Sequence, residues 1–269
     1  MSSVERLLNS PEELERLADN TFVAFALLDE LTFDYERLLK DIKYDWDIDI
    51  KASDIGEDEN GDIELLTDLE GSLVAISVVP HPLPRKVIHN QIAANPLWPE
   101  AESIVLDHKG YVLVYVSCKD GDLINSASLS VKLSTSVLKQ KHVIGVGNVS
   151  CVYSPANYLD TANAFLDEGL FPTSLIVYIG VYTDDEDEGR VNAYTSGLDR
   201  FGKLEIEIIG TKRNPEALYH FLTDVASYVI LGDVNFEDGE TVGFSDDQKL
   251  PIAISPGVAL KADTVKIGY

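Results

Sequence analysis

Basic residues are scarce in this chain of 269 residues. It contains 21 Lys and Arg against 46 Asp and Glu, which gives a formal net charge of -25 at pH 7. A surface with this surplus of negative charge repels the phosphate backbone of nucleic acids and the headgroups of anionic lipids. The sequence therefore predicts that the protein binds neither nucleic acid nor membranes. The partner that its charge attracts is a basic protein.

Cysteine and long apolar runs are also scarce. The two cysteines, Cys118 and Cys151, each fall in a segment with strand-forming residues. This usage is typical of a reducing compartment and does not suggest a disulfide framework. No apolar run approaches the roughly 20 residues that span a bilayer, and the first ten residues lack the pattern of a signal peptide. We therefore expect a cytoplasmic protein.

Helix and strand patterns alternate along the chain, and hydrophobic residues make up 45% of it. Ser154-Pro155 and Asn214-Pro215 each combine an N-cap residue with proline at the first helical position. Segments rich in β-branched and aromatic residues predict strands. These segments are residues 22–28, 73–79, 111–118, 142–153, 175–182 and 203–209. Together the patterns predict an α+β fold with mainly antiparallel sheets.

The order of these elements suggests a duplication. Strand, helix, two strands, helix and strand follow one another in residues 22–118 and again in residues 142–255. This is the split βαβ order of a ferredoxin-like unit. We therefore predict two such units, residues 1–121 with a leading helix and residues 142–269, joined by a helix over residues 122–141. Whether they form one domain or two stays open.

Two glutamates are the first candidate site. Over residues 203–209, apolar residues alternate with Glu205 and Glu207, which predicts a strand with one buried and one solvent-exposed face. At the rise of a strand the two carboxylates stand roughly 6–7 Å apart. Paired carboxylates at such a distance can carry out general acid–base chemistry. A solvated strand face has the same pattern, so both interpretations stay open.

A run of acidic residues is the second candidate site. It lies near the tip of a predicted hairpin, where it forms either a solvated loop or a surface for a basic protein. The run consists of Asp184, Asp185, Glu186, Asp187 and Glu188.

Sequence motifs for metals and cofactors are missing or incomplete. Residues 58–61 resemble the middle of a calcium loop, but Gly56 and Thr67 occupy the places of its first and twelfth ligands. The five histidines lack metal-ligand spacing, and neither a P-loop nor a nucleophile elbow occurs. The sequence therefore predicts no metal, no cofactor and no catalytic residue of these classes.

The C-terminal part, from about Tyr194 to Gly243, carries a family resemblance. Its motifs are residues 194–198 (Tyr-Thr-Ser-Gly-Leu), 201–207 (Phe-Gly-Lys-Leu-Glu-Ile-Glu), the helix over 214–231, and residues 232–234 and 238–243. These motifs resemble the bacterial family known as domain of unknown function 4261. The resemblance implies a bacterial cytosolic protein and brings no catalytic residues with it. Such proteins resemble immunity-associated families of bacterial toxin systems, although no motif of this chain carries that second likeness.

Three functions follow from these patterns. The leading hypothesis is a non-catalytic protein-interaction module, in one version an immunity-type protein whose acidic surface binds a basic toxin. It requires acidic residues around an apolar patch. The first alternative is a small-molecule-sensing domain with a site between the two units, which requires an enclosed pocket. The second is a hydrolase that uses Glu205 and Glu207, which requires a carboxylate of raised pKa in a cleft.

Overall fold

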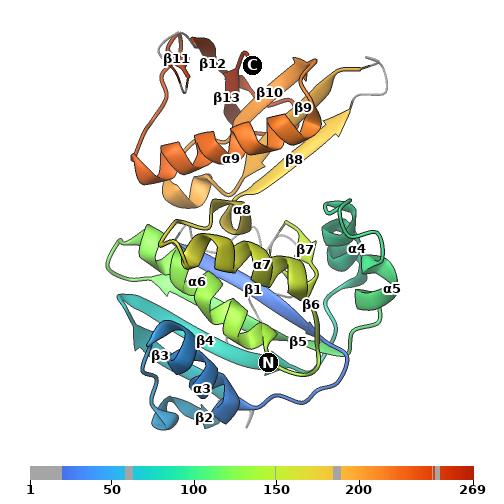
Figure 1. The fold of residues 1–269 in the computed structure, drawn as a ribbon, viewed down its shortest axis with the longest axis vertical. Coiled ribbons are helices and arrows are strands. Elements are labelled where there is room, and N and C mark those ends of the chain that lie inside the picture. The colour runs from blue at the N-terminus through green and yellow to red at the C-terminus, as the bar shows by residue number, and fades with distance from the viewer. Residues whose placement is uncertain (1–19, 58–62, 149, 184–188, 244, 246–248) are drawn as a thin grey trace. The chain divides into compact units, whose positions relative to one another are not determined.

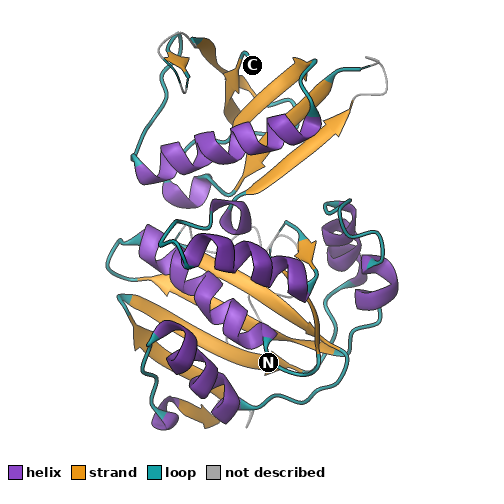
Figure 2. Cartoon of the chain, in the orientation of Figure 1, coloured by secondary structure: helices purple, strands orange, loops and turns teal. Residues whose placement is uncertain are grey.

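The computed structural model describes residues 20–57, 63–148, 150–183, 189–243, 245 and 249–269. The chain divides into two compact units, Met1–Pro172 and Thr173–Tyr269. Each unit contains one sheet with helices packed on it (Figures 1 and 2). The predicted α+β class with sheets rich in antiparallel pairs is confirmed. Among the described helices, none has both the length and the apolar character that crossing a membrane requires.

The first unit is built on a seven-stranded sheet in which every pair of neighbouring strands is antiparallel. The strand order is β2-β3-β4-β5-β1-β6-β7. The strands are β1 (Thr21–Leu28), β2 (Ile55–Glu57), β3 (Ile63–Leu69), β4 (Ser72–Val79), β5 (Gly110–Cys118), β6 (Val143–Gly147) and β7 (Val152–Tyr153).

Side-chain caps begin three of the helices in this unit. Asp34, Asp122 and Ser154 each accept a hydrogen bond from the backbone N–H three residues further on, which satisfies an amide without an intrahelical partner. The helices are α3 (Tyr35–Trp46), α4 (Arg85–Ala93), α5 (Ala101–Val105), α6 (Leu123–Leu138) and α7 (Pro155–Leu166), with a short 3₁₀ turn at Ala52–Asp54.

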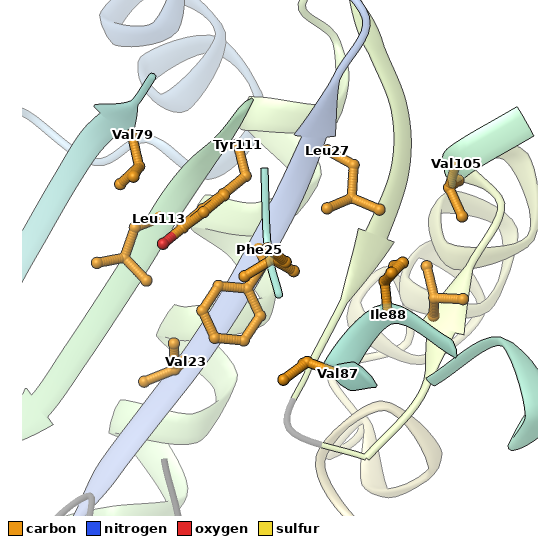
Figure 3. Packing of buried hydrophobic residues seen from close by; sticks show 11 residues of the cluster. Val23, Phe25, Leu27, Val79, Val87, Ile88, Val105, Tyr111 and Leu113 are labelled. Carbon is orange, nitrogen blue, oxygen red and sulfur yellow. The ribbon is translucent and has the colours of Figure 1, made fainter. Parts of the chain in front are cut away.

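Strand β1 lies inside the sheet between β5 and β6, and both of its faces are buried, since all eight of its residues are buried. On one face Phe25 packs edge-on against Tyr111, with 5.6 Å between the ring centroids. Val87 and Ile88 of α4 belong to the same apolar cluster (Figure 3). Successive side chains of a strand point to opposite faces. The other face of β1 therefore lies toward α6, which crosses β1 and β5 (Figure 1).

Helix α6 belongs to the core of the first unit, whereas the sequence suggested a connecting helix over residues 122–141. Its serines and threonines gave it a polar composition, but many of them are buried. Their hydroxyls donate to carbonyls three or four residues earlier, as from Ser130 to Ala127 and from Ser134 to Ser130. Such bonds satisfy the hydroxyls inside the helix, so these residues can be buried at low cost.

The ferredoxin-like arrangement is not confirmed. That arrangement would place β1 between β4 and β5, whereas the sheet has β5 between β4 and β1. The division between the units also differs from the predicted boundaries near residues 121 and 141. Strand β6 pairs with β1, which brings the chain up to Pro172 into the first unit.

The second unit contains a six-stranded sheet with the order β11-β12-β13-β10-β9-β8. Strands β10 and β13 are parallel, and the other described pairs are antiparallel. The strands are β8 (Tyr178–Thr183), β9 (Val191–Ser196), β10 (Ile206–Thr211), β11 (Thr241–Val242), β12 (Leu250–Pro256) and β13 (Asp263–Ile267). The helices are α8 (Thr173–Ile176) and α9 (Pro215–Leu231), with a 3₁₀ turn at Asp199–Phe201.

Helix α9 covers one face of this sheet (Figure 1). Asn214 caps it by accepting from the N–H groups of Glu216 and Ala217, and the helix ends before Gly232. Its buried side chains recur at helical spacing, and the helix predicted from the Asn214-Pro215 start is confirmed. They include Leu218, Leu222, Val225 and Val229.

The apolar cluster around Phe25 supplies a test of the first unit. Replacing Phe25 with Ala removes a fully buried ring, and we expect the free energy of unfolding to fall by about 3–5 kcal/mol. Both tryptophans of the chain, Trp46 and Trp98, lie in this unit. Urea unfolding followed by tryptophan fluorescence therefore reports on it selectively.

Tyr44 provides the matched control, because it is also aromatic but 90% exposed on α3. Tyr44→Ala should change the unfolding free energy by less than about 0.5 kcal/mol. Equal losses from Tyr44→Ala and Phe25→Ala would contradict this view of the core.

Candidate functional site

Glu207 lies inside the second unit, although the sequence predicted that it faces solvent. It occupies β10 in register with Tyr194 of β9 and Lys266 of β13, and it is 0% exposed. The prediction that Glu207 lies on a solvent-exposed strand face is therefore wrong. The reason is that residues 257–262 fold back over the strand and hydrogen-bond to its carboxylate.

The carboxylate of Glu207 accepts several hydrogen bonds. The backbone N–H groups of Val258, Ala259 and Leu260 donate to it, with N–O distances of 2.9 Å for Val258, 2.9 Å for Ala259 and 3.2 Å for Leu260. The hydroxyl of Thr264 donates from 3.2 Å, and the ammonium of Lys266 lies 3.0 Å away. A buried carboxylate with this many donors is stable only because each donor offsets part of its desolvation.

These donors also set the protonation state of Glu207. Burial by itself would raise the pKa of the carboxyl group. The N–H groups of Val258 and Ala259 and the ammonium of Lys266 act in the opposite direction, and the net pKa lies below its usual range. Glu207 is therefore ionised at neutral pH and unsuited to donating a proton.

Glu205 anchors a different loop. It precedes β10, and its carboxylate accepts from the Thr195 hydroxyl at 2.6 Å and from the N–H groups of Gly197 and Leu198 at 2.6 and 2.9 Å. A longer bond of 3.3 Å comes from the N–H of Asp199. Burial raises the pKa of Glu205, while the bonds from Thr195 and Gly197 oppose the rise.

The two glutamates therefore do not form one paired site. Glu205 holds the turn at residues 197–199, and Glu207 holds the turn at residues 258–260. Neither side chain lines the cavity described next. The other predicted binding residues, Asp184, Asp185, Glu186, Asp187 and Glu188, lie outside the described part of the chain.

A small cavity lies between the end of α9 and the sheet of the second unit. Its volume is about 190 Å³, and most of its lining is apolar. Val229 comes from α9, Ile206 from β10 and Val265 from β13. The remaining lining residues are Gly202, Lys203, Leu204, Val234, Asn235 and Phe236. We call this the α9 cavity.

Lys203 is the charged residue of this lining. Its side chain is only 6% exposed, and its ammonium donates to Asp233 at 2.6 Å and to Asn235 at 3.2 Å. Asp233 has a φ of 49°, a left-handed conformation that points the chain away from the end of α9. The hydrogen bond from Lys203 lowers the pKa of Asp233, so the Asp233 carboxylate stays ionised at neutral pH.

Sequence reasoning missed the α9 cavity. Lys203 and Asp233 are 30 residues apart, and neither belongs to a motif that signals a pocket. The sequence did predict that the helix ends at residue 231, and the segment that follows it supplies Val234 and Phe236 to the cavity. Within the described ranges, no group of three or more His, Cys, Asp and Glu side chains is arranged to hold a metal ion.

The anchoring roles of Glu205 and Glu207 can be tested by replacing each carboxylate with a neutral amide. Glu207→Gln weakens the charge-assisted bonds to residues 258–260, and we expect the amides there to exchange with deuterium about tenfold faster. Glu205→Gln is the matched control, because it should accelerate exchange at residues 197–199 and leave residues 258–260 unchanged. Hydrogen exchange followed by mass spectrometry resolves the two segments. Similar exchange of both segments in the two variants would contradict the assignment.

The lowered pKa of Glu207 gives a second, pH-dependent expectation. A carboxyl group whose folded pKa is depressed stabilises the fold above its unfolded pKa, near 4.3, and loses that effect as pH falls through the folded value. The difference in melting temperature between the wild type and Glu207→Gln should therefore be largest at pH 7 and shrink in acid. Calorimetry of the second unit's transition measures it, and a difference that grows in acid would contradict the sign.

The comparisons with known proteins concern the same region. No curated protein and no solved structure matches the chain. A family model matches residues 194–268, which run from β9 to the end of β13 and include α9, Glu205, Glu207 and the lining of the α9 cavity. The resemblance predicted from the sequence is confirmed, and the C-terminal part of the chain matches the domain of unknown function DUF4261.

Proposed function

We propose that the protein is a non-catalytic protein-interaction module that binds a basic protein, with the α9 cavity as the anchor point for one apolar side chain of that partner. The observation that carries the proposal is an apolar cavity with exposed acidic residues beside it. Asp233 precedes the lining residue Val234 and is 92% exposed in its side chain, and the exposed Glu237 follows the lining residue Phe236.

The size of the cavity favours a side chain over a whole ligand. Pockets for drug-sized molecules measure roughly 300–1,000 Å³, whereas this one measures about 190 Å³. A volume of this order accommodates one large apolar side chain. Interfaces commonly depend on such an anchor, placed in a desolvated pocket and surrounded by contacts that exclude water.

The charge of the second unit favours a basic partner. Thr173–Tyr269 contains 17 acidic residues and 8 basic ones. Among the described lining residues the cation is Lys203, and it is already bonded to Asp233 and Asn235. A negative surface around an apolar anchor accelerates encounter with a positive partner and makes association sensitive to salt. A basic toxin recognised by an immunity-type protein is one partner with this chemistry.

The roles of Glu205 and Glu207 do not favour the hydrolase alternative. A general acid or base needs a proton path to the substrate, but the Glu207 carboxylate is 0% exposed and covered by backbone amides. Glu205 has the raised pKa that this alternative requires, but its carboxylate is occupied by the Thr195 hydroxyl and by the amides of residues 197–199, and it does not line the α9 cavity. A different version of the small-molecule alternative, with its site in the α9 cavity of the second unit, has one observation in its favour, the buried ammonium of Lys203 at the wall of the cavity. A small organic acid is the ligand that this group would select.

The test begins with the tagged protein captured from its native cell at low and at high salt, with bound proteins identified by mass spectrometry. We expect a stoichiometric basic protein that is lost at high salt. Binding of the purified partner is then measured by calorimetry for the wild type, Phe236→Ala and Leu97→Ala. Phe236→Ala removes an aromatic ring from the lining of the α9 cavity and should weaken binding about tenfold or more.

Leu97→Ala is the matched control, because Leu97 is an 83% exposed apolar residue of the first unit. It should leave the affinity unchanged. Capture of a small acid without any protein would contradict the proposal and support the alternative. An affinity for the purified partner that Phe236→Ala does not change would remove the α9 cavity from the interface.

A further inference from the structure

The sheet of the second unit has a second face, opposite to the one that α9 covers. Val229 of α9 shares the cavity lining with Ile206 and Val265, which places α9 on the face that these two residues share. Glu207 points to the opposite face, in register with Lys266 of β13 and Tyr194 of β9. Tyr194 in turn pairs with Gly180 of the edge strand β8, so these residues form one row across four neighbouring strands.

Gly180 makes room on this opposite face for the ring of Tyr194. A Cβ atom built on Gly180 would come within 2.3 Å of Cε1 of Tyr194, far closer than van der Waals contact. The ring therefore occupies the space that a side chain at position 180 would fill. Tyr178 and Tyr182 lie two residues before and after Gly180, so both point to the same face as the ring.

The three tyrosines form a continuous aromatic strip along the edge strand. The ring centroid of Tyr194 is 6.0 Å from that of Tyr178 and 6.2 Å from that of Tyr182, and both pairs pack edge-on. All three residues are half-buried. Burial raises the pKa of Tyr194, and a hydrogen bond with Tyr178 opposes the rise, so the hydroxyl stays neutral at physiological pH. We call Tyr178, Tyr182 and Tyr194 the tyrosine strip.

The neighbours of the strip define what it can attract. In the same row, Glu207 is already neutralised by Lys266 and by the amides of residues 258–260, so it offers no free carboxylate. The three aromatic rings are therefore the recognition elements of this row. Aromatic faces attract cations through their quadrupole, and the surplus of acidic residues in this unit repels the phosphates of stacked nucleotides.

We propose that the tyrosine strip is a second binding surface, which receives a guanidinium or ammonium side chain of a basic protein through cation–π contacts. The proposal rests on the proposed function for the basic character of the partner, but it does not depend on the α9 cavity. Tyrosine supplies a large and rigid contact area with few torsions to immobilise, which makes it effective at interfaces. The edge position of β8 leaves the strip at the border of the sheet, where a partner chain can approach.

The test uses a short arginine-rich peptide and its citrulline counterpart, which keeps the shape but removes the charge. Binding to the full chain is followed by the ring resonances of selectively labelled tyrosine in NMR titrations. We expect the arginine peptide to shift the resonances of Tyr178, Tyr182 and Tyr194, and the citrulline peptide to leave them unchanged. Tyr194→Ala should weaken binding of the arginine peptide roughly fivefold to tenfold.

Three variants separate this proposal from other effects. Tyr194→Phe keeps the ring and should retain most of the affinity. Gly180→Ala should displace the ring and lose affinity as Tyr194→Ala does, which covers the case in which Tyr194→Ala fails to fold. Tyr44→Ala removes the 90% exposed tyrosine of the first unit and should leave the affinity unchanged.

Equal shifts with the citrulline peptide would overturn the proposal, because charge would then play no part. Unchanged affinity in both Tyr194→Ala and Gly180→Ala would overturn it too, since the peptide would be bound by acidic residues elsewhere. Phe236→Ala distinguishes the two proposals: it tests the α9 cavity and should not alter peptide binding at the tyrosine strip.

Discussion

The second unit depends on one buried ion in β10. The Glu207 carboxylate is removed from water and receives backbone amides from residues 258–260, the hydroxyl of Thr264 and the ammonium of Lys266. This single group joins β10, β13 and the loop before β13. Leaving it without donors would cost several kcal/mol, so the loop and the strand hold their places together. Glu205 does the same on a smaller scale for the turn after β9.

These two glutamates explain part of the acidity of the chain in a way that composition does not suggest. An Asp or Glu surplus is normally attributed to a solvated surface. Here two members of the surplus act as acceptors for backbone N–H groups in turns, where regular secondary structure leaves such groups without partners. Two exposed acids, Asp233 and Glu237, flank lining residues of the α9 cavity, and Lys203, the cation among the described lining residues, is already paired with Asp233.

Local features could be predicted from the sequence. The starts of α7 and α9 follow from Ser154-Pro155 and Asn214-Pro215, because an N-cap and a proline act within one turn of the chain. The class of the fold and the family resemblance were equally accessible. Features that depend on distant partners were not. The burial of Glu207 depends on residues about 50 positions later, and an alternating strand with glutamates looks the same whether a loop covers it or water does.

The same limit applies to the first unit. Helix α6 was predicted to connect two units because of its place in the element order. Its serine and threonine hydroxyls bond within the helix, which allows the helix to be buried in the first unit. The pairing of β6 with β1 joins residues more than a hundred positions apart. Element order alone cannot reveal such a pairing, which is why the sequence prediction began the second unit at residue 142, whereas the first unit of the structure extends to Pro172.

The parallel pairing of β10 with β13 has a consequence for how the second unit folds. Glu207 and Thr264 are 57 residues apart in the chain, with α9 and two further strands between them. Closing a loop of this length costs entropy before any contact offsets it. Until β13 arrives, β10 is paired with β9 on one side but lacks its second neighbour, and the Glu207 carboxylate remains hydrated, because its donors are not yet in place. Pairing of β13, the last described strand, with β10 therefore completes this part of the sheet. The same event removes water from the Glu207 carboxylate.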